Sequence, residues 1–195
     1  MIRSIAVIVW ALGVGRADAG AKPLPSSTAQ AWATAIQRTA KQQHIDPFSL
    51  VAIFRWESGL RPGAINKSSG AAGLGQIMPH FHGACKGTAD PHKAPTPACR
   101  ATKARLLDPL YNIAKVGKHI TAWRKLCRRL TGRPALFHRW LAGYAGRNII
   151  KGETCGQRRS NNRWQDKRQS PYVRRVTQYR RHLLRQLRRR ARAQR

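Results

Sequence analysis

Acidic side chains are scarce in this sequence of 195 residues, which has 7 Asp and Glu against 38 Lys and Arg. The formal net charge is therefore +31, and a field of that size attracts polyanions whatever their sequence. Nucleic acids, anionic polymers and lipid headgroups would all respond to it, so the charge alone identifies no partner. Chemistry that requires a pair of carboxylates has few candidate side chains here.

The sequence also lacks the patterns of a β-protein and of a membrane protein. No run of alternating polar and apolar residues is convincing, so the fold class is expected to be all-α, that is, predominantly α-helical. The apolar stretch from Ile5 to Val14 follows a basic start and is too short to cross a bilayer comfortably. Since Ala17-Asp18-Ala19 is an acceptable cleavage site, residues 1–19 are predicted to be a signal peptide outside the core. An uncleaved N-terminal anchor is the alternative.

Cysteine is used sparingly, at Cys85, Cys99, Cys127 and Cys155. None of the four stands in a Cys-x-x-Cys spacing, so we expect neither a metal site nor a cofactor. Export would make these residues disulfide candidates, and four cysteines allow three pairings. We favour Cys85–Cys99, which would pin a proline-rich loop, together with Cys127–Cys155, which would tie a helix to a late loop. The sequence alone leaves the choice open.

Helix start signals organise the rest of the chain. Asp46-Pro47 and Asp108-Pro109 each combine an N-cap residue with a proline in the first turn, and Ser170-Pro171 begins the last helix. The length suits one domain with a sizeable core and is short for two. We therefore predict a linker over residues 20–28 and a single domain over residues 29–184.

Glu57 ends an otherwise apolar helical run. At helical spacing, Leu50, Ile53 and Phe54 lie on its own face. Apolar neighbours solvate a carboxylate poorly, so the pKa of Glu57 should rise and the side chain could donate a proton near neutral pH. The cationic field opposes this shift, but salt screens distant charges beyond about 8 Å and we expect burial to dominate. The alternative is a glutamate turned outward or paired with Arg61.

A glycine-rich loop follows this glutamate and completes a pattern of motifs. Glu57-Ser58-Gly59 is followed by Gly73-Leu74-Gly75-Gln76-Ile77-Met78-Pro79 and later by Gly143-Tyr144-Ala145-Gly146. In these motifs, and in Asn112-Ile113 and Tyr172-Val173, the sequence resembles the soluble lytic transglycosylase (SLT) domain. That family has a lysozyme-like fold and cuts bacterial peptidoglycan. The resemblance spans nearly the whole predicted domain.

The resemblance implies a reaction that needs one carboxylate. Glu57 would protonate the β-1,4 glycosidic oxygen between N-acetylmuramic acid and N-acetylglucosamine. It would then deprotonate the muramyl C6 hydroxyl, which attacks its own C1 and leaves a 1,6-anhydro ring. Glycosidic cleavage otherwise usually takes two carboxylates, so this chemistry suits a sequence with few acids. Ser58, Gly73 and Gln76 would bind substrate or position the acid, and Tyr144 would hydrogen-bond near Glu57 and help to orient it.

These side chains also have purely structural alternatives. Ser58 could end a helix, Gln76 could bond only to loop backbone, and Tyr144 could belong to the core. Two positions depart from the family pattern. Gly75 stands where the family usually has methionine, which is expected to remove an apolar wall of the cleft, and the third motif lacks the family's asparagine after Tyr144.

The leading interpretation is an exported lytic transglycosylase, periplasmic or cell-wall associated, that acts on peptidoglycan glycan strands as a monomer. Family analogy adds local wall opening for a secretion or conjugation apparatus. One alternative is a hydrolase that uses water, like goose-type lysozyme. Another is a non-catalytic cationic protein that binds wall, membrane or nucleic acid. The last helix is expected to fray into an arginine-rich tail, residues 185–195, which is either a solvated basic face or a contact with an anionic wall or membrane surface.

Overall fold

The chain folds into helices, as expected, with one small sheet. In this computed structural model the structure describes residues 8–9, 12, 25–86, 96–132, 136–145, 153–155, 157–160, 163–166 and 171–193. The helices are α2 (Ser26–Gln43), α3 (Pro47–Ser58), α4 (Pro97–Leu107), α5 (Pro109–Thr131), α6 (Phe137–Tyr144) and α7 (Pro171–Ala193). Two 3-10 turns, η1 (Pro79–Phe81) and η2 (Gly83–Cys85), lie between α3 and α4. The predicted predominantly α-helical class is confirmed.

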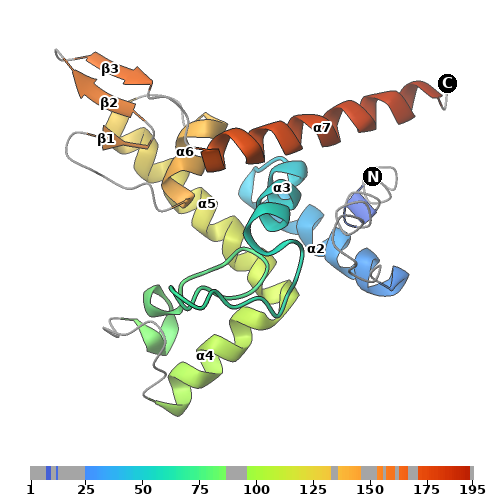
Figure 1. Cartoon of the computed structure of the whole chain (residues 1–195), viewed down its shortest axis with the longest axis vertical. Coiled ribbons are helices and arrows are strands. Elements are labelled where there is room, and N and C mark those ends of the chain that lie inside the picture. Colours follow the sequence, from blue (N-terminus) through green and yellow to red (C-terminus); the bar gives the residue numbers. More distant parts are fainter. Residues whose placement is uncertain are drawn as a thin grey trace.

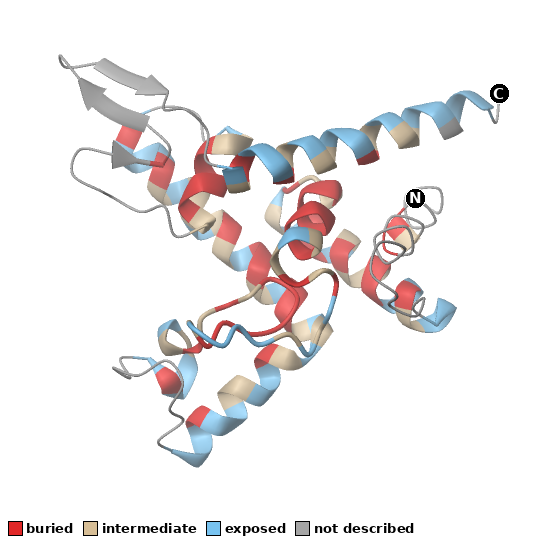
Figure 2. Ribbon diagram, in the orientation of Figure 1, coloured by how far each residue is buried: buried red, intermediate tan, exposed pale blue. Residues whose placement is uncertain are grey.

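Helix α3 lies at the centre of the packing. It contacts α2, α5 and α7, and the residues of its middle turns, Leu50 to Phe54, are fully buried. Figure 1 shows α5 running diagonally through the molecule and α7 passing over α3 toward the C-terminus, while α4 lies far from α7. In Figure 2 the second half of the loop after α3, residues 70–77, is largely buried as well. The C-terminal end of α3 therefore meets the loop and the start of α7 in the interior of the fold.

The two predicted proline-containing helix starts are confirmed. The Asp46 side chain accepts a hydrogen bond from the Ser49 amide, and the Asp108 side chain accepts one from the Tyr111 amide. Helix α4 was not predicted, because only Cys99 and Leu106 of its residues are buried and it shows no apolar stripe. The last helix begins at Pro171, as predicted, and Ser170 lies outside the described residues.

The sheet consists of β1 (Glu153–Thr154), β2 (Gln157–Ser160) and β3 (Arg163–Asp166). The strands pair antiparallel in the order β1-β2-β3. The sequence analysis found no strand here because the strands have at most four residues and are mostly polar, so no alternation of polar and apolar residues arises. Strand β1 contacts α5, and the sheet lies away from the C-terminal end of α7 (Figure 1).

Both favoured disulfides are present. Cys85–Cys99 joins η2 to the first turn of α4, and Cys127–Cys155 joins α5 to the turn after β1. The described part of the chain contains no free cysteine. The proline-rich loop that the first bridge was expected to pin lies largely outside the described residues.

Two residues of the expected signal peptide belong to the hydrophobic core. Ile8 and Leu12 are fully buried and cluster with the core residues, so the expectation that residues 1–19 stay outside the core is wrong for this pair. The burial of apolar side chains is favourable wherever an apolar surface is available to cover them, and the folded chain provides such a surface. Their removal by cleavage stays a prediction. Among the described helices, none is both long and apolar enough to cross a membrane.

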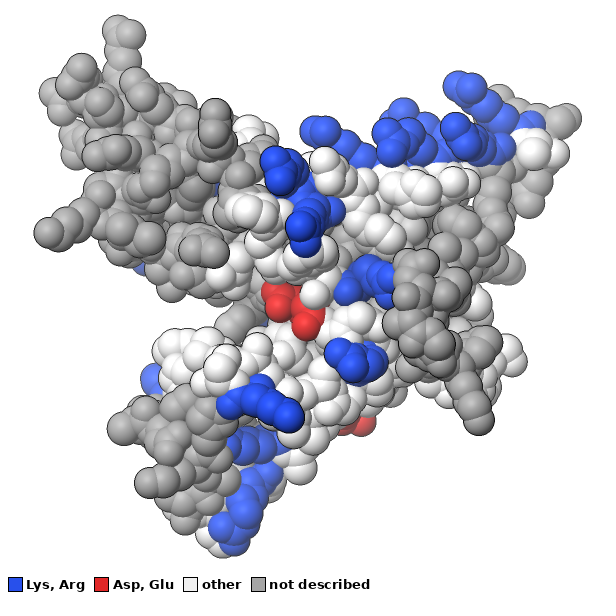
Figure 3. All heavy atoms as spheres, viewed as in Figure 1, with Lys and Arg blue, Asp and Glu red and all other residues white. Residues whose placement is uncertain are grey.

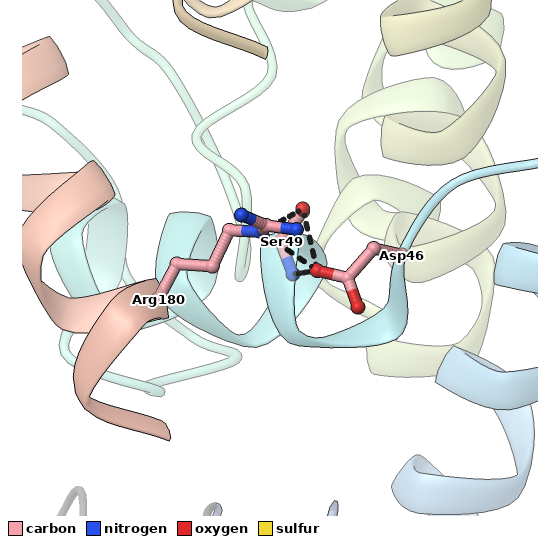
Figure 4. Close-up of polar contacts among 3 residues, drawn as sticks. All are labelled: Asp46, Ser49 and Arg180. Carbon is pink, nitrogen blue, oxygen red and sulfur yellow. Dashed lines mark hydrogen bonds and ion pairs between the residues drawn. The ribbon is translucent and has the colours of Figure 1, made fainter. Parts of the chain in front are cut away.

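Helix α7 is tied to α3 by its inner face. The Arg180 guanidinium donates from Nε to Asp46 Oδ2 at 2.7 Å and to Ser49 Oγ at 3.0 Å (Figure 4). Val173, Val176 and Leu183 are buried along the same helix. The helix continues to Ala193, so most of the arginine-rich tail expected to fray is helical.

Candidate active site

Glu57 lies in the last turn of α3, where the helix opens onto a cleft. Gly59 ends the helix in the left-handed conformation with φ 62° and turns the chain into the glycine-rich loop. The cleft has a volume of about 710 Å³ and lies between the end of α3, that loop, α5, α6 and the start of α7. Its lining residues include Glu57, Gln76, His119, Tyr144 and Tyr172. The carboxyl group is thus half-buried and open to a ligand.

The pKa of Glu57 is raised to about 7, as the sequence predicted. Burial among apolar neighbours is the dominant cause, because it disfavours the charged carboxylate. A hydrogen bond opposes the shift: the Tyr172 hydroxyl donates to Glu57 Oε1 at 2.6 Å and stabilises the charged form. The effect of burial on the pKa is larger than that of the hydrogen bond, so the side chain can donate and accept a proton near neutral pH.

Asn112 holds the glycine-rich loop against α5 through buried hydrogen bonds. This fully buried side chain on α5 accepts a hydrogen bond from the Gly75 amide at 2.8 Å. Its amide group donates to the carbonyls of Ala72 at 3.1 Å and Leu106 at 2.7 Å. Gly73 has a φ of 78°, and a Cβ there would overlap both Asn112 and the Leu106 carbonyl. Gly73 therefore serves the close approach of loop and helix and does not line the cleft.

Gln76 lines the cleft and also braces the loop. Its backbone is left-handed, with φ 49°, and its side-chain amide donates to the carbonyls of Ala64 at 3.1 Å and Gly73 at 3.0 Å. Both amide protons thus have partners in the loop. The predicted contact with substrate stays a prediction, while the alternative, a side chain that satisfies loop backbone, is present.

Ser58 faces the protein. Its hydroxyl donates to the Phe54 carbonyl at 3.1 Å and accepts from the Arg61 amide at 3.2 Å, and the residue is 3% exposed. It does not line the cleft, so the helix-ending role applies. Arg61 donates from Nε to the Ser58 carbonyl at 2.9 Å. The alternative pairing of Glu57 with Arg61 is not formed.

Tyr144 lines the cleft, but its hydroxyl donates to the Gly75 carbonyl at 2.6 Å and not to Glu57. The predicted hydrogen bond to the acid comes from Tyr172. Sequence reasoning missed this role, although Tyr172 stood in one of the family-like stretches, because the two residues are 115 positions apart. The Tyr144 hydroxyl instead joins α6 to the glycine-rich loop through its hydrogen bond to Gly75.

The space expected at Gly75 is not open. A Cβ at this position would overlap Val116 and would lie 2.8 Å from the Tyr144 hydroxyl. The branched side chain of Val116 and the Tyr144 hydroxyl occupy this volume, while the expected loss of an apolar wall stays a prediction. Glycine here also leaves its carbonyl accessible to the Tyr144 hydroxyl.

Comparison with known proteins identifies the family of this chain. The family model of the transglycosylase SLT domain matches residues 34–167, which is more than half of the chain. The protein belongs to the transglycosylase SLT domain family. No curated protein and no solved structure matches the chain significantly. Family membership assigns the chain to peptidoglycan cleavage of the lytic transglycosylase type, and so to action on the cell wall.

Proposed function

We propose that this protein cleaves the β-1,4 bond between N-acetylmuramic acid and N-acetylglucosamine and forms 1,6-anhydromuramic ends. The observation that carries the proposal is a half-buried Glu57 whose pKa is raised to about 7 at the wall of an open cleft. Among the described residues that line this cleft, Glu57 is the only carboxylic acid. A cleft with a single carboxylic acid supports a mechanism in which one group first donates and then accepts a proton. It supports a mechanism with two carboxylates less well.

In this mechanism, protonated Glu57 gives its proton to the glycosidic oxygen as the bond to the muramyl C1 breaks. The resulting carboxylate is held by the Tyr172 hydroxyl. It then accepts the proton of the muramyl C6 hydroxyl, whose oxygen attacks C1. No water is consumed, since a hydroxyl of the same sugar has a large effective concentration. Gln76 and Tyr144 shape the cleft wall, and Ser58 and Gly73 support the helix end and the loop.

Product analysis tests the proposal. Purified peptidoglycan is digested with the protein, and the released fragments are weighed by mass spectrometry. We expect anhydromuramyl ends. Reducing ends that are heavier by one water would favour the goose-type-lysozyme alternative, and binding without cleavage would favour the non-catalytic one. Export to the periplasm or wall, a monomeric state, and local wall opening for a secretion or conjugation apparatus are parts of the proposal that rest on family analogy.

The activity is expected to fall as the pH rises through about 7, because the general acid must carry its proton. Tyr172→Phe removes a hydrogen bond that lowers the pKa of Glu57. The pKa should then rise, and the fall in activity should move to higher pH. A profile of kcat/KM against pH on soluble glycan strands measures this. An unmoved or downward-moved limb in Tyr172→Phe would contradict the assignment of Glu57 as the titrating acid.

We also propose that the outer side of α7 contacts the anionic wall. Exposed arginines at positions 174, 181, 185, 188 and 192 fall on one side of the helix, opposite the buried face, over about 27 Å. Figure 3 shows Lys and Arg atoms along this outer edge. Because the apolar face packs on α3, the row is expected to bind by charge and not by insertion.

Charge reversal tests this contact. The variant Arg185→Glu/Arg188→Glu/Arg192→Glu is expected to weaken binding to intact sacculi by about ten-fold at low salt, with the difference vanishing at high salt. The matched variant with lysine at the same three positions keeps the charge and should bind like wild type. Sedimentation with sacculi across a salt series gives the measurement. Equal binding by all three proteins would leave the row without an electrostatic role.

A further inference from the structure

An exposed tryptophan lies at the rim of the cleft, immediately before the candidate acid. Trp56 is 42% exposed, although the turns that precede it in α3 are buried. Its indole meets the edge of the Tyr172 ring, with centroids 6.4 Å apart and planes at 81°. Tyr172 lines the cleft and binds Glu57. Trp56 does not itself line the cleft, but it contacts a residue that does, next to the reacting centre.

Arg175 covers this tryptophan. Its guanidinium carbon lies 5.1 Å from the centroid of the indole ring, and the residue is exposed. It stands three residues after Tyr172 on α7, so it lies about one turn further along the same helix. A cation–π contact holds a guanidinium in place without neutralising its charge. The guanidinium is thus held beside Trp56 on an exposed residue and keeps its charge.

No carboxylate of the described part of the chain pairs with Arg175. Arg180, which lies further along α7, pairs with Asp46 at the start of α3. Among the described residues, this is the ion pair that involves α7. A guanidinium has five donors and suits the planar, two-oxygen geometry of a carboxylate. Trp56 and Arg175 together thus offer an apolar ring and an unpaired cation beside the cleft.

We propose that Trp56 and Arg175 form a subsite that binds a carboxylate of the peptide stem carried by N-acetylmuramic acid. This inference rests on the proposed function. The sugars of the strand carry no charge while the lactyl carboxyl group of each muramyl residue is amide-bonded to a stem. The stem itself is anionic and is attached to the same muramyl residue whose C1 must lie at Glu57. Trp56 contacts Tyr172, which binds Glu57, and Arg175 contacts Trp56, so a stem that leaves the cleft on this side would reach both side chains. The subsite would therefore select muramyl residues that still carry a stem.

Two substrates separate this role from a general effect of charge. Glycan strands with their stems are compared with the same strands after an amidase has removed the stems and the lactyl carboxylates that this exposes have been converted to neutral amides. Arg175→Ala is expected to lower kcat/KM about ten-fold or more on strands with stems, mainly through KM, because a charge-assisted hydrogen bond is lost. On stem-free strands its kcat/KM should equal that of wild type. Arg175→Lys keeps the charge but not the fork geometry, and should recover part of the loss.

The chain offers a matched control. Arg105 also holds its guanidinium over an aromatic ring, 4.4 Å from the centroid of Tyr111, and is exposed. Among the described residues, however, Tyr111 makes no ring contact with a residue that lines the cleft, whereas Trp56 contacts Tyr172. Arg105→Ala removes the same charge and the same kind of contact, so it should leave kcat/KM unchanged on both substrates. The thermal unfolding midpoints of the arginine variants check that the fold is intact.

The outcomes are distinct. An equal loss for Arg175→Ala on both substrates would overturn the subsite and assign Arg175 to the support of Tyr172. A loss matched by Arg105→Ala would show an effect of net charge alone, and no loss on either substrate would also overturn the subsite. Wild-type protein that cleaves neither substrate would overturn the proposed function itself. Cleavage of both substrates with no selective loss overturns the subsite alone.

Discussion

Glu57→Gln is expected to abolish turnover, with a loss in kcat of at least about 10²–10⁴-fold, because glutamine can neither donate nor recover the proton. The amide has the shape of the protonated acid, and its oxygen can still accept the hydrogen bond from Tyr172. The fold should therefore remain. Burial raises the pKa of Glu57, so the folded state of the wild type loses stability as the pH rises toward and through about 7. The glutamine variant should lack that loss.

Zymography on a gel that contains peptidoglycan provides the measurement, with anhydromuramyl product release as a second readout. Asp108→Asn is the matched control. It also removes one carboxylate, but from an exposed helix cap at which asparagine serves equally well. This control should clear the gel like wild type. Equal clearing by Glu57→Gln would remove Glu57 from the mechanism.

The second large effect is expected for Asn112→Ala, which should lower the free energy of unfolding by roughly 3–5 kcal/mol. The substitution leaves the Gly75 amide and the Leu106 carbonyl without their Asn112 partner, and the Ala72 carbonyl keeps only its bond from the Ile77 amide. Each buried polar group left without a partner costs about 1–3 kcal/mol. For a chain of this size the midpoint of thermal unfolding should fall by roughly 10 °C. Activity should fall as well, because the loop carries Gln76 into the cleft wall.

Thermal and denaturant unfolding measure this effect, with Asn66→Ala as the comparison. Asn66 also bonds within the loop, accepting from the Ser68 amide at 2.9 Å and the Ser69 amide at 3.0 Å, but these bonds are exposed. Water can replace them, so the cost should be well under half of that for Asn112→Ala. Indistinguishable unfolding of the two variants would show that the buried asparagine does not hold the loop.

Local signals in the sequence were sufficient for the acid and its helix. The apolar face below Glu57 predicted burial and a raised pKa, and the Asp-Pro pairs predicted where α3 and α5 begin. These features depend on residues within a few positions of one another. Cysteine pairing was narrowed to three choices by counting, and the favoured one is present.

The partners across the cleft could not be derived in the same way. Tyr144 and Tyr172 are both aromatic residues in helical stripes, and nothing local distinguishes the one that reaches Gly75 from the one that reaches Glu57. That difference depends on how α6 and α7 pack. Helix α4 and the sheet were missed for a related reason, since few apolar side chains of α4 are buried and the strands are short and polar.

Helix α7 gives the cleft one of its walls, and it is the last element of the chain. A polypeptide that stops short of residue 171 has neither the hydroxyl that holds Glu57 nor the arginine that ties α7 to Asp46. Synthesis must therefore reach α7 before the cleft can close around its acid. Proteolysis before residue 171 is expected to remove this wall and leave Glu57 without its hydrogen-bond partner.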